Sequence, residues 1–139
     1  HGEYVEGTCL LDLEMTLAGE IRREPWQTNT CLGNWFYDAA CTYRTAERVI
    51  QQMVDVVSKN GTFLLSVPLR PDGTIDEQEE KITDDIAAWM ALNGEAIYET
   101  RPYDHYGEGP STEGEKKELI RGLVCTERDF RFTRKIGLK

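Results

Sequence analysis

One stretch of the chain concentrates aromatic side chains among hydrogen-bonding ones. Between Pro25 and Tyr37 it places two Trp, one Phe and one Tyr beside Thr, Asn and Gln side chains and a Gly. A buried strand would be continuously apolar and a half-buried strand would alternate, so this mixture indicates more than packing. Flat apolar rings beside polar donors suit a ligand that is apolar on one face and hydroxylated at its rim, such as a sugar.

Carboxylates precede this aromatic stretch. In Leu11–Met15 the apolar residues alternate with Asp12 and Glu14, which predicts a short strand or an extended loop edge with both carboxylates on one side. Taken alone, such a pair is most simply a solvated acidic edge. The charged link from Glu20 to Glu24 is also most simply solvated.

The spacing of cysteine and histidine disfavours metal chemistry. Structural zinc needs close ligand pairs, whereas the four cysteines form no Cys-x-x-Cys and only two histidines could join them. We therefore expect no metal and no cofactor. Because four cysteines are too few for a disulfide framework at this length, buried free thiols are expected at Cys9, Cys31, Cys41 and Cys125.

Composition indicates one globular domain with an acidic surface. The chain has 139 residues, enough for one core, and its net charge is -9. Nucleic acid and anionic membranes need a positive footprint, so both are disfavoured as partners. No apolar run approaches the roughly 20 residues of a membrane span, and no signal peptide opens the chain. A start at His1 without an initiator Met suggests a processed or excised segment.

Two helices and a strand must position the aromatic stretch. Thr45 is the expected N-cap of the first helix and Asn60-Gly61 its stop. Between them, residues at helical spacing form one apolar stripe: Ala46, Val49, Ile50, Met53, Val54 and Val57. The strand predicted at residues 62–67 is apolar on both faces, which is typical of a parallel strand covered by helices on each side.

A second helix follows a turn. Pro71-Asp72-Gly73 is a turn signal, and Thr74 with Glu77 predicts a capping box. Helical spacing then continues to Asn93-Gly94 and includes Trp89, which we assign to the core.

The order of these elements is that of an α/β fold with a parallel sheet. Two strands cannot form such a sheet alone, so the remaining strands are expected either outside this chain or formed from other segments of it. Residues 95–103 continue as an extended segment. Residues 104–118 are predicted as a mobile loop or linker, and residues 119–124 and 130–133 as strands of a new β region.

Four segments together resemble the α-L-fucosidases of glycoside hydrolase family 29. The similarity runs in order from about Leu11 to Thr133 and is carried by PWQTNTCLGNWFY, VDVVSKNG, TFLLSVPLRPDGTI and ALNGEAIYETRPY. The resemblance implies that residues 1–103 are the C-terminal portion of a (β/α)8 TIM-like barrel. Residues 104–118 would then be a linker or loop, and residues 119–139 the beginning of a C-terminal β-sandwich.

The resemblance also implies a reaction. Enzymes of this family remove terminal α-L-fucose with retention, using an Asp nucleophile and a Glu acid/base about 5 Å apart. The position that matches the local pattern of the acid/base is Glu14. Glu20 and Glu24 are alternatives, because this loop varies within the family.

Two tryptophans are candidate substrate-binding residues by the same resemblance. Trp35 matches an aromatic that lines the fucose site, whereas Trp26 could either bind substrate or plug the barrel. Asp38 and Arg70 lie near the predicted active face, although solvation is the simpler interpretation for both.

Departures from the family pattern limit what the chain is expected to do. No Asp has the setting of the nucleophile, neither His1 nor His105 matches a fucose-binding histidine, and Tyr103 stands where many relatives carry Trp. We therefore expect a fragment that carries the acid/base, lacks the nucleophile and does not hydrolyse alone. The alternative is a non-catalytic carbohydrate-binding or structural remnant of such a barrel.

The resemblance implies the partners and a location as well. The expected partners are a fucosylated glycan or oligosaccharide and the remainder of the barrel. A secreted, periplasmic or lysosomal location is implied by the family alone, and the fucosyl linkage is not specified by these residues.

Overall fold

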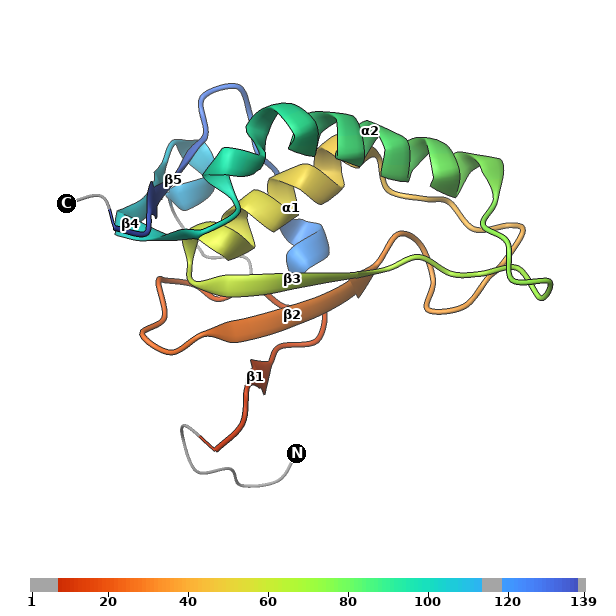
Figure 1. The fold of residues 1–139 in the computed structure, drawn as a ribbon, viewed down its shortest axis with the longest axis horizontal. Helices are drawn as coiled ribbons and strands as arrows, with labels where there is room; N and C mark the ends of the chain where they lie inside the picture. The colour runs from red at the N-terminus through yellow and green to blue at the C-terminus, as the bar shows by residue number, and fades with distance from the viewer. Residues whose placement is uncertain (1–7, 114–118, 138–139) are drawn as a thin grey trace.

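The computed structural model describes residues 8–113 and 119–137, and its centre is a parallel sheet. The sheet has the order β1-β2-β3, formed by β1 (Leu11–Asp12), β2 (Trp26–Cys31) and β3 (Gly61–Ser66). Helices α1 (Ala46–Ser58) and α2 (Glu77–Asn93) both lie on one side of it, with α1 against β3 and α2 against α1 (Figure 1). The predicted parallel α/β arrangement is therefore present.

Helix α1 begins and ends where the sequence predicts. The Thr45 side chain accepts a hydrogen bond of 3.3 Å from the Arg48 amide, and Asn60 takes the left-handed conformation with φ 70°. Its most buried positions differ from the predicted apolar stripe, however. Only Val49 of that stripe is fully buried, together with residues outside it that face the C-terminal part of the chain: Gln52, Asp55, Val56 and Ser58.

The capping box of α2 lies two residues later than predicted. The Asp76 carboxylate accepts from the Glu79 amide at 2.9 Å, and the Glu79 carboxylate accepts from the Asp76 amide at 3.2 Å. Thr74 is not the cap because it lies in the preceding turn, where its amide and hydroxyl donate to Asp72 at 3.0 and 2.7 Å. Those bonds close the predicted turn, in which Gly73 has φ 86°. Trp89, assigned to the core, is only partly buried.

Two antiparallel strands follow α2 in the C-terminal part of the chain. Strand β4 (Thr100–Glu108) runs through the expected boundary at residue 103 and pairs antiparallel with β5 (Phe130–Lys135). Short 3-10 helices η1 (Gly94–Ala96), η2 (Pro110–Thr112) and η3 (Ile120–Gly122) complete the described elements. The strand expected over residues 119–124 is thus wrong, and residues 114–118 of the expected linker lie outside the described residues.

A single core joins both parts of the chain. Its buried side chains come from the loop after β1, from β2, from α1 and from η3: Leu17, Ala18, Trp26, Val56, Ile120 and Leu123. Ile120 and Leu123 therefore pack with the parallel sheet.

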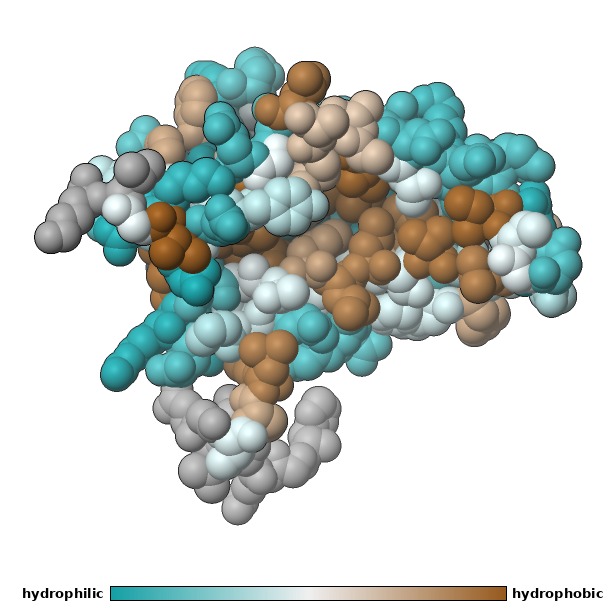
Figure 2. Space-filling model, viewed as in Figure 1, coloured by the Kyte–Doolittle hydropathy of each residue, from teal (hydrophilic) through white to brown (hydrophobic). Residues whose placement is uncertain are grey.

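The sheet face opposite α1 is uncovered. Leu64 is 47% exposed and Thr62 is exposed, so β3 is covered on one face and not on two as predicted. Figure 2 shows apolar side chains gathered in the band between α2 and the sheet, whereas the outer surface of α2 is hydrophilic over its N-terminal part only; Leu92 near its C-terminal end is exposed. No helix within residues 8–113 and 119–137 is long and apolar enough to cross a membrane.

Candidate functional site

An open hollow lies on the uncovered face of the parallel sheet and reaches the carboxyl ends of its strands. Its volume is about 510 Å³, and its lining residues are Glu14, Gln27, Asn29, Trp35, Leu64 and Ser66. Glu14 follows β1 and Trp35 follows β2, and carboxyl ends of parallel strands meet at one edge of a sheet. The structure therefore brings together the carboxylate and the aromatic ring that the sequence singled out separately.

The backbone around Glu14 is fixed to β2. The Leu13 amide donates to the Gln27 carbonyl at 2.8 Å, and the Met15 amide donates to the Asn29 carbonyl at 3.0 Å. Met15 turns the chain away from the sheet with φ 53°. Glu14 stands between these two anchored residues with an exposed side chain. Its carboxylate is thus presented to the hollow from a tethered backbone.

Asp12 shares the face of the sheet that carries the hollow. Its Oδ1 accepts a hydrogen bond from Gln27 Nε2 at 3.2 Å, and its Oδ2 accepts one from Asn29 Nδ2. Gln27 and Asn29 are two residues apart on β2, so they project from the same face. Both amides are therefore held between Asp12 and the hollow.

The loop that carries Trp35 is tightly anchored at its base. The Leu32 amide donates to the Ser66 carbonyl at 3.1 Å, and Arg121 Nη2 donates to the Gly33 carbonyl at 2.6 Å. A Cβ at Gly33 would lie 2.3 Å from the Cys41 sulfur, so only glycine fits there. Trp35 beyond this anchor is 44% exposed. An exposed ring on a fixed base can contact a ligand without rearrangement.

Arg44 connects the carboxyl end of β2 to α1 by hydrogen bonds. It donates to the Thr30 hydroxyl at 3.0 Å and also to the Cys31 carbonyl and the Gln52 side chain. Burial, and secondarily the nearby guanidinium of Arg121, lower the pKa of Arg44 to about 10, so it remains charged at neutral pH. Sequence reasoning missed Arg44 and Arg121, because both contacts join residues distant in the chain.

The two alternative acid/base residues lie at the other end of the sheet. The Arg22 amide donates to the Lys59 carbonyl at 3.3 Å, which places the segment 19–24 near the amino end of β3. Glu24 lies two residues before the start of β2, and its Oε1 is 3.6 Å from Arg23 Nε. Six strand residues span about 20 Å, so Glu24 is separated from Trp35 by the length of β2. Neither Glu20 nor Glu24 lines the hollow.

Trp26 belongs to the core and not to the hollow. It is 0% exposed, and its Nε1 donates to the Lys59 carbonyl at 3.0 Å. No part of the Trp26 ring is therefore open to a ligand in this structure, which does not favour substrate binding by Trp26. The interpretation of Trp26 as a plug is the one that matches its surroundings.

Asp38 and Arg70 hold loops. Asp38 accepts from the Ala40 amide at 2.9 Å, and Arg70 donates to the Ile75 carbonyl at 2.7 Å and to Glu77 at 2.8 Å. Neither side chain lines the hollow. Both therefore have local structural partners beyond simple solvation.

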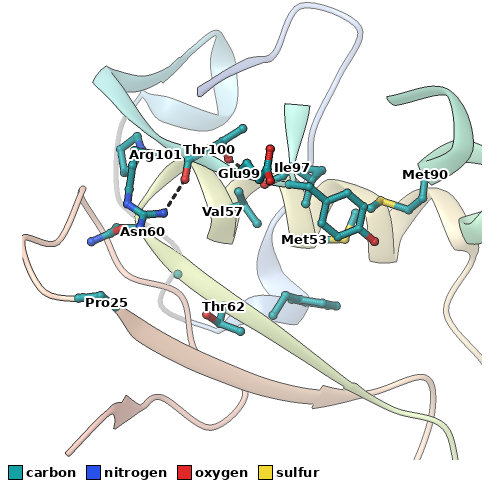
Figure 3. Close-up of a pocket in the computed structure, with 14 residues that line it drawn as sticks. Pro25, Met53, Val57, Asn60, Thr62, Met90, Ile97, Glu99, Thr100 and Arg101 are labelled. Carbon is teal, nitrogen blue, oxygen red and sulfur yellow. Dashed lines mark hydrogen bonds between the residues drawn. The ribbon is translucent and has the colours of Figure 1, made fainter. Parts of the chain in front are cut away.

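A second cavity, of about 560 Å³, opens between the helices and the amino end of β3. Figure 3 shows Met53, Val57 and Met90 on one side of it, with Arg101 Nη1 donating to the Thr100 carbonyl at 2.8 Å. It is lined mainly by apolar side chains and lies at the end of the strands opposite to Glu14 and Trp35. The larger cavity is thus not the one where candidate catalytic groups meet.

The expectation of buried free thiols holds for burial at one cysteine only. All four cysteines are free, but only Cys31 is buried, whereas Cys9 is exposed and Cys41 and Cys125 are intermediate. Within the described part of the chain, no three His, Cys, Asp or Glu side chains are grouped so that they could hold a metal ion.

Several curated proteins have similar sequences. Human plasma α-L-fucosidase is 38% identical over 61 residues, which are 44% of this chain and 13% of that protein. Mouse tissue α-L-fucosidase is 29% identical over 83 residues, which are 56% of this chain and 18% of that protein. The matched parts thus span only about an eighth to a fifth of these relatives.

Solved structures and a family model agree with these similarities. The Thermotoga maritima α-fucosidase in complex with fucose has a TM-score of 0.68 and 26% identity, over 86% of this chain and 25% of that one. Isoenzyme 1 from Paenibacillus thiaminolyticus has a TM-score of 0.63 and 29% identity, over 67% of this chain and 24% of that one. The family model described as α-L-fucosidase matches residues 3–95. The chain therefore belongs to the α-L-fucosidase family, whose catalytic domain is a TIM barrel.

Proposed function

We propose that this chain is the C-terminal part of the catalytic (β/α)8 barrel of a retaining, exo-acting α-L-fucosidase. The observation that carries the proposal is the hollow shared by Glu14 and Trp35 at the carboxyl ends of parallel strands. Barrel enzymes place their chemistry at that end. The uncovered sheet face would then be the barrel interior, and α1 and α2 would belong to its outer ring.

Glu14 acts as the general acid and base of a double displacement. In the first step its proton passes to the glycosidic oxygen while a carboxylate nucleophile attacks the anomeric carbon and the leaving group departs. In the second step Glu14 removes a proton from water, which attacks the same carbon and releases the nucleophile. Its exposed side chain on an anchored backbone suits repeated proton exchange with a bound substrate.

The nucleophile comes from outside this chain. Asp12 is the nearest carboxylate in sequence on this edge, but both its oxygens accept hydrogen bonds from the Gln27 and Asn29 amides, which reduces its availability to attack. The remainder of the barrel must then supply the opposite wall of the site. This chain alone is accordingly expected to be inactive.

Trp35 provides a platform for the apolar face of a terminal fucose. Its exposed ring is flat, and the amides of Gln27 and Asn29 line the same hollow, so one sugar can meet an apolar surface and polar groups together. A fucosylated glycan or oligosaccharide is the substrate class that fits this pairing.

Single substitutions in the full-length protein test the role of Glu14. Hydrolysis of an aryl α-L-fucoside by Glu14→Ala should fall by about 100-fold or more, because loss of general acid/base catalysis typically costs that much. Glu20→Ala and Glu24→Ala are matched controls and should stay within about twofold of wild type. An unchanged rate in Glu14→Ala would remove Glu14 from its role. A wild-type protein that binds fucosides without hydrolysing them would support the carbohydrate-binding alternative.

A further inference from the structure

The hydrogen bonds of Asp12 determine which way two side-chain amides point. An ionised carboxylate only accepts hydrogen bonds, whereas an amide carries donors on nitrogen and an acceptor on oxygen. Gln27 Nε2 and Asn29 Nδ2 both donate to Asp12. One N–H of each amide is therefore engaged with the same carboxylate, and the amide oxygens Oε1 and Oδ1 are left for other partners.

Both amides line the hollow that contains Glu14 and Trp35. With their nitrogens directed to Asp12, the amides turn their oxygens Oε1 and Oδ1 away from that carboxylate as acceptors for a ligand. The Glu14 carboxylate, when ionised, is also an acceptor. The floor of the hollow is thus suited to a ligand with several hydrogen-bond donors beside an apolar face.

We propose that Asp12 is a positioning residue that selects substrates by their hydroxyl donors. This inference rests on the proposed function and extends it. By fixing the Gln27 and Asn29 amides, Asp12 leaves their oxygens to accept hydrogen bonds that sugar hydroxyls donate. Without this carboxylate each amide can rotate and present nitrogen in place of oxygen. Asp12 touches neither the sugar nor the reacting atoms.

A merely structural role for Asp12 would have different consequences. Strand β1 is already tied to β2 by backbone hydrogen bonds, including those from the Leu13 and Met15 amides. Loss of the Asp12 carboxylate therefore should not release Glu14 from its position. The effect is expected in substrate affinity and in discrimination among sugars, and not in the chemical step.

The test compares sugars that differ only in a donor. In the full-length protein, methyl α-L-fucoside and its three monofluorinated derivatives, in which fluorine replaces one hydroxyl, compete with an aryl α-L-fucoside. For wild type, at least one fluorine should weaken inhibition about tenfold, the scale of one net hydrogen bond. For Asp12→Asn, KM should rise about fivefold or more with kcat within about threefold, and that derivative should inhibit within about twofold of the parent sugar.

Controls separate positioning from folding and from the proposed function. Thr62→Ala changes the same sheet face beside Gln27 without removing a hydrogen bond to it, and should behave as wild type. If Asp12→Asn does not fold, Asn29→Ala carries the same test. Discrimination that persists in a folded Asp12→Asn or Asn29→Ala protein overturns the role of Asp12 while leaving the fucosidase proposal intact. A wild-type protein that hydrolyses no fucoside overturns the proposed function instead, and this inference with it.

Discussion

At the scale of single residues, the two tryptophans of one aromatic stretch have opposite surroundings. Trp26 starts β2 and is fully buried, whereas Trp35 follows the strand and is 44% exposed. The sequence predicts an aromatic ligand surface here but cannot assign each ring. Assignment depends on Val56 and on the Lys59 carbonyl, which contact Trp26 only after α1 packs on the sheet.

Replacing each tryptophan should therefore affect a different property. Trp26→Ala removes a fully buried ring, so the free energy of unfolding of the full-length protein should fall by about 3–5 kcal/mol. Trp35→Ala should leave that free energy within about 1 kcal/mol and raise KM for an aryl fucoside. Urea unfolding and steady-state kinetics measure the two effects. Equal losses of stability in both variants would contradict the assignment.

Asp129 should make stability depend on acid pH. Burial opposes ionisation, but hydrogen bonds from Ser111 and Thr126 outweigh it and lower the pKa of Asp129 to about 2. The unfolded value is about 3.9, so this carboxylate contributes stability that is complete above about pH 5 and lost as pH falls from about 4 to 2.

The matching variant is Asp129→Asn. Its free energy of unfolding in urea should lie below that of wild type at pH 6, and the difference should shrink on acidification. Asp84→Asn, on the exposed surface of α2, serves as the control. A deficit in Asp129→Asn that is the same at pH 6 and pH 3 would show that the ionised form contributes nothing.

At the scale of elements, buried charged side chains connect α1 to the antiparallel strands β4 and β5. Asp55 is 0% exposed and accepts from Lys59 Nζ at 2.7 Å and from Arg131 Nε at 2.7 Å. Lys59 lies over the ring of Tyr106 at 4.5 Å. Burial lowers the pKa of Lys59, and the charge of Asp55 partly restores it. This cluster joins α1, β4 and β5.

The cluster also shows where prediction from sequence stops. The ends of α1, the turn at Gly73 and the strand β3 follow from caps, glycines and apolar spacing, which act over a few residues. Asp55 lies off the predicted apolar stripe, and its partner Arg131 is 76 positions away. In the site, Glu14 and Trp35 were found by type and family pattern, whereas the roles of Gln27 and Asn29 required the register of β1 and β2.

Asp55→Ala should be strongly destabilising. It leaves the Lys59 and Arg131 charges buried without their partner, which typically costs about 3–5 kcal/mol. Asp85→Ala is the control, because the exposed pair of Lys81 and Asp85 at 2.6 Å is solvated and contributes little. Chemical denaturation of both full-length variants gives the comparison. Similar losses in the two would contradict the importance of burial at Asp55.

At the scale of the whole molecule, the parallel sheet of the described residues carries helices on one face only (Figure 1). A parallel sheet is normally covered on both faces, yet the face with Leu64 and Thr62 is open. The matches to two solved α-L-fucosidases each cover about a quarter of the length of the solved chain, which is consistent with the proposal that this chain is part of a larger domain. The antiparallel strands β4 and β5 nevertheless pack with the sheet and helices, because both contact α1.

Ending the protein at the boundary that the sequence suggested should therefore fail. A full-length protein truncated after Tyr103 loses β5, Arg131 and the core residue Ile120, so it should show no cooperative unfolding transition. Truncation after Gly137 keeps all three and is the matched control. Circular dichroism during heating distinguishes them. A cooperative transition in the shorter protein would contradict the single core.

The most direct test of the account is the product that Glu14→Ala forms with azide. Without its acid/base, a retaining enzyme should still form the fucosyl-enzyme from 2,4-dinitrophenyl α-L-fucoside, since that leaving group needs no protonation. Azide should then attack the anomeric carbon, displace the nucleophile, accelerate turnover and yield α-L-fucosyl azide. The configuration is read by NMR. A β-L-fucosyl azide would make Glu14 the nucleophile, and no acceleration by azide would contradict a catalytic role for Glu14.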